Sequence, residues 1–505
     1  MLKRFSIFCF LRQEDGTVAI LWAMGLVVFF GLVALAFDIG RIGTTQNELQ
    51  SYADNVALAA AGELDGKNDA IIRATSAANA LISDSKTFGT NGNVLSGASD
   101  YTLTFHSNLP TSDTAALGAD ITTDPALAVF ARVEAQPSTV SMTFLRVVNS
   151  LLGTNTNAVN ALVDAEAVAG FTQEACDITP LMFCLPSPGF KANNNIGSLI
   201  RLRSGGQGAA WGPGDFGFLD PTKSDLGATC KNLTGVNLLA CLVGAELAVT
   251  QCFTQRGVDT EPGQKVGIED AIFNVRFDIY KSIMNGEKND PDYPPAPNVI
   301  SGIVPKGGGS CIGQNENQSP DTVGIPRDTC FANGTCPYAR IGDGVWDQQS
   351  YLNINHDLNG DGVGNDSHLP QLPVGSRFSG SGTRYEMYLR EIAYGNSGAL
   401  PGGNILSGLS ETGRPQCSSN MSSRPERRVV IAAGIDCTAN PINGRATNVP
   451  VEEFFELFLT EPVGDDGASP PTLDLWVEIL GSAGGDGYGA AGTGGIFRDV
   501  VQLYR

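Results

Sequence analysis

The sequence predicts an α+β protein in which a single N-terminal transmembrane helix continues into a long helix. A small antiparallel sheet module and a β-rich, disulfide-containing region follow. Three observations predict this fold class. Residues 17–37 form an uncharged apolar run, residues 38–172 change from helical to strand periodicity, and ten of the eleven cysteines lie beyond residue 175. We therefore divide the chain into an arm (1–16), a membrane helix (17–37), a helix-plus-sheet module (38–172) and a region of one or two domains (173–505).

The membrane helix is predicted from its length and from the charges around it. Thr17–Phe37 contains 21 residues without a charge, and a helix of that length spans about 31 Å, the thickness of the hydrocarbon core. The basic residues that precede it are Lys3, Arg4 and Arg12. The positive-inside rule then places the arm in the cytoplasm and residues 38–505 outside. We expect a single-pass protein of the bacterial inner membrane, with its bulk periplasmic or extracellular.

A cleaved signal peptide is the alternative for this segment, because Ala34-Leu35-Ala36 offers small residues of the kind found at a cleavage site. An apolar run of 21 residues exceeds the usual 7–15 of a signal core, however. The helical pattern also continues beyond the proposed cut. A retained anchor is therefore the preferred interpretation.

The next segment, residues 38–83, has the pattern of a long alanine-rich helix. Apolar residues recur at helical spacing, at Ile42, Leu49, Tyr52, Val56 and Ala60. Gly62 and Gly66 are expected to kink or break this helix, after which the pattern resumes over residues 70–83. Two shorter helices joined near Gly40 and Gly43 are the alternative.

Three strands and one helix are predicted for the rest of the module. Apolar and polar residues alternate over residues 101–106, 127–135 and 159–169, which is the period of a strand. Between the last two strands, residues from Val140 to Leu152 fit one face of a helix. We expect Pro137 and Ser138 to start that helix and Gly153 to end it.

The cysteines indicate that residues 173–505 fold in an oxidising compartment. Ten cysteines are an even number, as a disulfide framework requires. Zinc binding and free thiols are the alternatives, but for zinc the chain has no C-x2-4-C pair and only three histidines. The pairing cannot be deduced from sequence. Short apolar runs at 429–433, 454–459 and 473–480 predict strands between long polar loops.

Net charge excludes one class of partner. The formal charge is −21 and the pI is about 4.5. An acidic surface repels phosphate backbones, and the basic residues are scattered. We expect no nucleic-acid binding.

The first sixty residues resemble a known family. The motif runs from a charged arm through G-x-V-A-I, an apolar run and an aspartate to L-Q-x-x-A-D-x-x-A-L-A. The residues that carry it are Gly16-Thr17-Val18-Ala19-Ile20, Ala36-Phe37-Asp38-Ile39-Gly40, Leu49-Gln50 and Ala53-Asp54-Asn55-Val56-Ala57-Leu58-Ala59. This pattern is similar to the TadE/TadG-like family of the tight-adherence (Flp-type) pilus assembly system. Phe144-Leu145 and the alanine-rich strand 161–169 extend the resemblance more weakly.

The resemblance implies a periplasm-facing accessory protein of pilus assembly without enzymatic activity. Its partners would be inner-membrane lipid and other pilus-assembly or pilin-like proteins. Ala19, Ala23 and Gly31 are small enough for close approach of neighbouring helices. Two departures stand out. Pseudopilin relatives carry glutamate five residues after the cleavage glycine, where this chain has Leu21, and no D-x-S-x-S sequence of a von Willebrand A metal site occurs.

One loop has the start of a calcium motif. Oxygen ligands stand at Asp357, Asn359 and Asp361, with Gly362 next, as in the first six positions of an EF-hand loop. Position 12 is His368 rather than glutamate, so Asp366 or a distant acid would have to complete the site. A solvated turn of Asn, Asp and Gly is the alternative. No cofactor is certain, and Ca2+ is the candidate.

Two other function classes stay open. One is a membrane-tethered adhesin or calcium-stabilised binding domain unrelated to pili. The other is a periplasmic hydrolase, for which His106, His356 and His368 are the available bases, none of them beside a G-x-S-x-G elbow. Residues 487–492 fit G-x-G-x-x-G, but too little chain follows for a dinucleotide site, so we expect a loop there.

Overall fold

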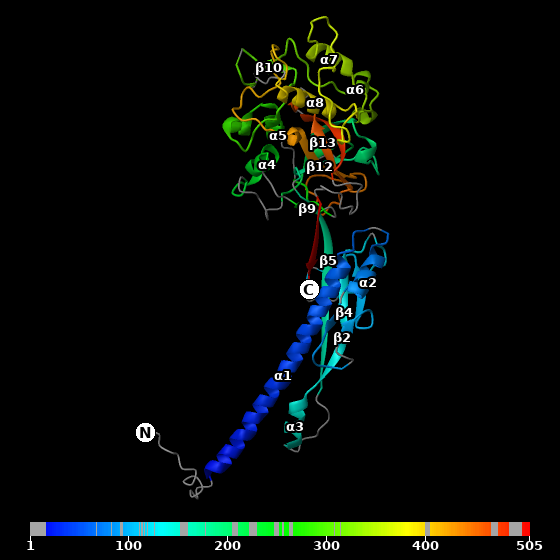
Figure 1. The fold of residues 1–505 in the computed structure, drawn as a ribbon, viewed down its shortest axis with the longest axis vertical. Coiled ribbons are helices and arrows are strands. Elements are labelled where there is room, and N and C mark those ends of the chain that lie inside the picture. The colour runs from blue at the N-terminus through cyan, green and yellow to red at the C-terminus, as the bar shows by residue number, and fades with distance from the viewer. Residues whose placement is uncertain are drawn as a thin grey trace, which may run out of the picture. The chain divides into compact units, whose positions relative to one another are not determined.

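The computed structural model divides into two compact units. Unit 1 comprises Met1–Thr172 with Val500–Arg505, and unit 2 comprises Gln173–Asp499 (Figure 1). The structure describes residues 17–504 except 67, 82, 91–93, 111, 113–114, 116, 119, 126, 152–159, 177, 205–210, 222–229, 247–251, 255–256, 262–265, 308, 314, 399–404, 466–472 and 484–496. The predicted arm 1–16 and the loop 487–492 lie outside the described residues.

One long helix dominates unit 1. Helix α1 (Thr17–Ala61) is continuous past Gly40 and Gly43, so the apolar run and the alanine-rich segment form one element. It ends one residue before Gly62, and the chain turns into α2 (Ala70–Leu81). The predicted continuation of the membrane helix and the predicted break are both confirmed.

The sheet of unit 1 is antiparallel along β3, β4 and β5, with strand order β16-β5-β4-β3. Its strands are β3 (Tyr101–His106), β4 (Phe130–Ser141), β5 (Asn160–Cys176) and β16 (Phe497–Leu503). A separate hairpin joins β1 (Ser83–Ser85) to β2 (Val94–Ser96). The C-terminal half of α1 packs on this sheet through small buried residues of both elements. They include Ala53, Ala57, Ala60, Ala131, Ala167 and Ala169.

The predicted start of the helix after β4 is wrong. Pro137 and Ser138 lie inside β4, where the register with β5 shifts between Ala135 and Ser138. A bulge tolerates proline because its backbone position needs no ladder hydrogen bond. The helix is α3 (Thr143–Leu151), which begins only after the strand has paired as far as Ser141.

Unit 2 is built on a mixed seven-stranded sheet. Its order is β13-β12-β6-β8-β7-β15-β14, and β13 also pairs with β15, so six of the strands close into a ring. The strands are β6 (Leu181–Cys184), β7 (Leu199–Ser204), β8 (Asp215–Phe218), β12 (Val429–Ile435), β13 (Glu453–Leu459), β14 (Gly464–Asp465) and β15 (Leu473–Ser482). Two pairs, β12 with β6 and β7 with β8, are parallel, and the other pairs are antiparallel. The three predicted strand runs correspond to β12, β13 and β15.

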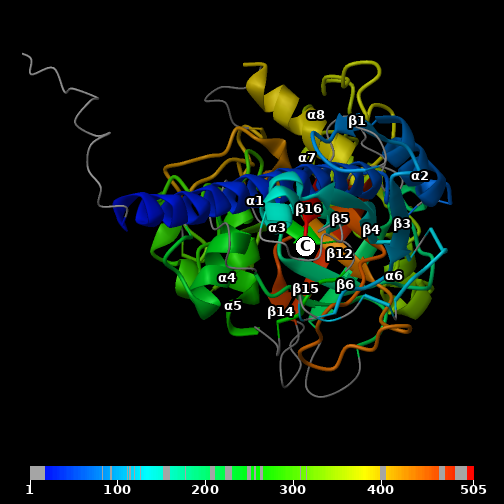
Figure 2. The same cartoon turned by 90° about the horizontal axis from the view of Figure 1, so that it is seen from below.

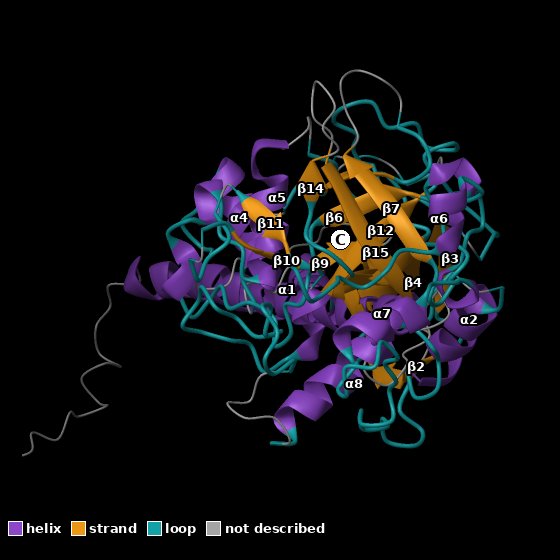
Figure 3. Cartoon of the chain, turned by 90° about the horizontal axis from the view of Figure 1, so that it is seen from above, coloured by secondary structure: helices purple, strands orange, loops and turns teal. Residues whose placement is uncertain are grey.

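Helices and short strands surround this ring (Figure 3). Helices α4 and α5 pack together on one part of its core, and α7 and α8 line another. The remaining elements of unit 2 are α4 (Gly235–Gly244), α5 (Val266–Asn274), α6 (Thr329–Asn333), α7 (Gln348–Asn355), α8 (Arg384–Asn396), β9 (Cys252–Thr254), β10 (Ile303–Pro305) and β11 (Glu316–Gln318).

Disulfides of unit 2 include two long-range bonds and two local ones. The described bonds are Cys184–Cys437, Cys230–Cys241, Cys311–Cys417 and Cys330–Cys336. Cys176 is also disulfide-bonded and lies opposite Cys252 in the β5–β9 pairing. The predicted disulfide framework is confirmed, and the α+β fold class with it.

Candidate functional site

The N-terminal half of α1, residues 18–37, carries an exposed apolar surface. From Val18 to Phe37 the side chains are exposed, apart from Gly31 and Ala34, and none is charged. A soluble protein rarely exposes so many apolar residues in one contiguous patch. The helix is long and apolar enough to cross a membrane, and no other described helix is. This surface is therefore the first candidate for function.

The C-terminal half of α1, residues 38–61, is instead packed against protein. Leu49, Tyr52, Val56 and Ala57 are fully buried against the sheet of unit 1. Gln50 and Gln46 donate hydrogen bonds to the backbone oxygens of Glu166 and Asp164 on β5. One continuous helix thus exposes its first half and holds a folded unit with its second.

Asp38 and Arg41 mark the change between the two halves. Asp38 is buried, and its carboxylate accepts hydrogen bonds from the backbone N–H groups of Phe144 (3.4 Å) and Leu145 (2.7 Å), at the start of α3. Arg41 donates to the Ser141 oxygen (3.1 Å) and to the Thr143 hydroxyl (2.6 Å). A carboxylate at a helix N-terminus is favourable because it satisfies free N–H groups and faces the positive end of the dipole. In the sequence, Asp38 stands out only as part of the family motif.

The acidic loop of unit 2 is a hydrogen-bonded turn. Asp357 accepts hydrogen bonds from the N–H groups of Gly360, Asp361 and Gly362. The Asn359 amide donates to Asp361 at 2.8 Å. Gly360 and Gly362 have positive φ, as a turn this tight requires. Asp357, Asn359 and Asp361 therefore share one turn, in which the carboxylates of Asp357 and Asp361 accept backbone hydrogen bonds.

Asp366 pairs with a residue outside this loop. It forms an ion pair with Arg390 on α8 at 2.7 Å, and the guanidinium lowers the pKa of the carboxyl. Among the described residues, no group of three His, Cys, Asp or Glu side chains is arranged to hold a metal. Calcium binding by Asp357, Asn359, Asp361 and Asp366 stays a prediction.

The histidines occupy two places. His356 lies between His368 (3.1 Å, Nδ1 to Nε2) and Glu391 (2.9 Å), and the Tyr351 hydroxyl donates to the same carboxylate at 2.6 Å. His106 is buried in unit 1 next to the Thr104 hydroxyl, 3.2 Å away. The first cluster connects α7 to α8. No sequence pattern indicated Glu391, because it stands within an ordinary helical pattern.

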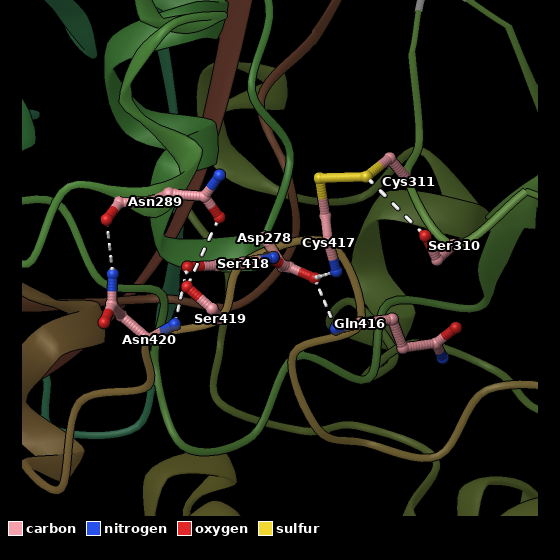
Figure 4. Close-up of a disulfide and its surroundings, with 9 residues drawn as sticks. All are labelled: Asp278, Asn289, Ser310, Cys311, Gln416, Cys417, Ser418, Ser419 and Asn420. Carbon is pink, nitrogen blue, oxygen red and sulfur yellow. Dashed lines mark hydrogen bonds between the residues drawn. A yellow bond between two sulfur atoms is a disulfide. The ribbon is translucent and has the colours of Figure 1, made fainter.

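A second carboxylate organises backbone near a disulfide (Figure 4). Asp278 accepts hydrogen bonds from the N–H groups of Gln416 (2.6 Å), Cys417 (2.6 Å) and Ser418 (2.8 Å), and Cys417 is bonded to Cys311. Burial raises the pKa of Asp278, and the three donors act against that rise. These hydrogen bonds hold the loop that carries Cys417.

Comparison with known proteins identifies the N-terminal segment. Residues 16–63 match a family model described as Flp pilus-assembly TadE/G-like. The match confirms the resemblance and extends over both halves of α1. The matched family is a component of pilus assembly rather than an enzyme family. No curated protein and no solved structure gives a significant match to the chain.

Proposed function

We propose that this chain is a membrane-anchored, periplasm-facing structural protein of Flp-type pilus assembly, which acts through helix packing and protein contacts. The observation that carries the proposal is the coincidence of two boundaries. The family match over residues 16–63 coincides with α1 (Thr17–Ala61), whose first half is bare and apolar and whose second half holds unit 1. A family that assembles fibres at a membrane needs an element of this kind.

The bare half of α1 has room for a neighbouring helix. Ala19 and Ala23 lie one turn apart and are exposed, and a methyl group added at Gly25 or Gly31 would meet no atom within 4 Å. Within lipid, helices associate by close packing at small residues, because burial of apolar surface gives no gain there. The proposed partners are therefore the apolar helices of pilus subunits or other assembly factors.

Piliation of the deletion strain is the direct test. Removing the gene should abolish surface pili, counted by electron microscopy, and the wild-type gene supplied in trans should restore them. Normal piliation in the deletion strain would contradict the proposal.

A matched pair of variants tests the packing surface. Ala23→Leu fills the small-residue face, whereas Ala36→Leu adds the same side chain about 140° around the helix, at 100° per residue. We expect A23L to reduce piliation strongly and A36L to leave it unchanged, with equal amounts of both proteins in the membrane fraction. Equal piliation would show that this face makes no specific contact.

Orientation is tested with the cysteines. Cys9 lies in the proposed cytoplasmic arm, and the other ten lie in the proposed periplasmic region. In intact cells a membrane-impermeant maleimide should label no site without reductant, and only sites beyond residue 175 after a membrane-impermeant reductant has acted. Labelling of Cys9 in intact cells would reverse the proposed orientation.

A further inference from the structure

Helix α3 of unit 1 has an apolar side on which two large side chains stay about half exposed. Phe144 is 46% exposed and Val147 is 55% exposed. Arg146, which lies about 160° around the same helix from Phe144 at 100° per residue, is exposed as well. A short helix with one apolar and one polar side, both uncovered, is typical of an element at a boundary between water and lipid.

Helix α3 begins where the apolar run of α1 ends. Its first N–H groups bind Asp38, and the ring of Phe144 lies 5.5 Å from the ring of Phe37, the last residue of that run. Phe37 is itself exposed. The apolar side of α3 is therefore continuous with the outer surface of the membrane-spanning segment.

The course of α3 carries this continuity further. Figure 1 shows α3 beyond the end of the β4 and β5 strands, pointing back toward the start of α1, and Figure 2 also places it beside α1. Within residues 18–38 only Ala34 (6% exposed) and Asp38 (1%) are buried, and they lie one turn apart. One stripe of α1 is thus covered at the level of α3, while the rest of its surface stays free.

We propose that α3 is a second membrane contact, which inserts Phe144 and Val147 into the leaflet from which α1 emerges. The proposal rests on the membrane anchoring of α1 and adds a second point of attachment. Two contacts fix the tilt and rotation of unit 1 against the bilayer, which one helix leaves free. Asp38 fits this position because a carboxylate beside hydrocarbon is stable only with hydrogen-bond donors, and the N-terminus of α3 supplies them.

Nitroxide labelling of the full-length protein tests the proposal. In a Cys9→Ser background, Val147→Cys is labelled and the protein is reconstituted in vesicles of phosphatidylethanolamine and phosphatidylglycerol. Collision with oxygen, which concentrates in lipid, is compared with collision with a water-soluble nickel chelate. Val33→Cys on α1 is the lipid reference, Ile72→Cys on α2 is the water reference, and Arg146→Cys is the control on the polar side of α3.

We expect an oxygen-to-nickel ratio at residue 147 close to that at residue 33 and several-fold above that at residue 72, with residue 146 more open to nickel than residue 147. A water-like ratio at 147 with a lipid-like ratio at 33 would overturn the proposal and leave the anchor intact. Shielding of 147 from both reagents would assign the face to a protein partner and also overturn it. A water-like ratio at 33 would refute the anchor itself. Far-ultraviolet circular dichroism confirms that each labelled variant keeps its fold.

Discussion

The cores of the two units contain different kinds of side chain. In unit 1, α1 lies on the sheet through alanines and valines, so helix and strand backbones approach closely. In unit 2, large aromatic side chains fill the core, and fully buried arginines such as Arg384 and Arg428 bind carboxylates or backbone oxygens within it. Unit 1 depends on small volume, whereas unit 2 depends on covalent bonds and paired charges. We therefore expect different substitutions to destabilise the two units.

Loss of the longest disulfide should have the largest effect. Cys184–Cys437 closes 253 residues and Cys330–Cys336 closes 6. Chain entropy predicts that replacing the first pair by serine costs about 5 kcal/mol and replacing the second about 2 kcal/mol. Urea unfolding followed by hydrogen exchange in peptides of each unit measures both costs. Unit 1 should be unaffected, and equal costs for the two pairs would contradict the entropic basis of the comparison.

Removal of a buried cation should come next. Arg384 forms ion pairs with Asp328 and with Glu478 (3.2 Å), and all three side chains are fully buried. Arg384→Met leaves two carboxylates in the core without a cation, which costs about 3–5 kcal/mol. The control is Arg445→Met, because the Arg445–Asp220 pair is 57% and 29% exposed and should contribute about 0–1 kcal/mol. Similar losses of stability in both variants would show that buried ion pairs do not distinguish unit 2 from unit 1.

Overfilling should damage unit 1 by a smaller amount. Ala57→Leu adds three carbons at the fully buried contact between α1 and the sheet, and overpacking of this kind costs about 1–3 kcal/mol. Ala36→Leu, on the exposed half of the same helix, should cost nothing measurable. Hydrogen exchange in peptides of β4 and β5 reports the loss. Unchanged protection from hydrogen exchange in A57L would show that the contact between helix and sheet accommodates the larger side chain.

Calcium, if it binds the acidic loop, should stabilise unit 2 alone. At several times its dissociation constant the ion adds about 1 kcal/mol, measured as a rise in the melting temperature over a sample with chelator. Asp361→Asn should remove the rise, and magnesium should not reproduce it. Identical melting with calcium and with chelator would refute the predicted site.

Mild acid should give the smallest effect, and it should reach both units. Burial lowers the pKa of His106 in unit 1, assisted by Arg132, and burial also lowers the pKa of His368 in unit 2, assisted by His356. In each case the unfolded chain takes up a proton first, near the ordinary value of about 6.5, so stability falls as the pH drops through and below that value. His106→Gln should abolish the loss in unit 1 between pH 7 and 5 and leave that in unit 2. An unchanged loss in unit 1 would exclude His106 as its source.

Local patterns predicted the elements of unit 1 well. The uncharged run, the helical spacing and the alternation at residues 101–106 each lie within one element, so α1 and β3 could be predicted directly. The start of α3 could not, because Pro137 follows a helix-start rule while its strand continues through a bulge. The N-terminal capping of α3 by Asp38 joins residues more than a hundred positions apart and leaves no local signature.

Unit 2 shows the same limit at a larger scale. Its strands β12, β13 and β15 were visible as apolar runs, but their closure into a ring depends on pairings with β6 and β7, more than two hundred residues earlier. The buried partners of Arg384, Asp278 and Glu391 are likewise set by tertiary structure. The acidic loop could be predicted as a turn, whereas the ion pair of Asp366 with Arg390 depends on where α8 lies.

The return of the chain to unit 1 has a consequence for biosynthesis. Val500–Arg505 belongs to unit 1, the Tyr504 N–H donates to the Val168 oxygen at 2.8 Å, and β16 is the neighbour of β5 in the sheet. Everything between Thr172 and Val500 must therefore be translated and delivered to the folding compartment before that sheet can be completed. Until then β5 presents an open edge to newly arrived chains, which makes this interval the time when a chaperone would matter most.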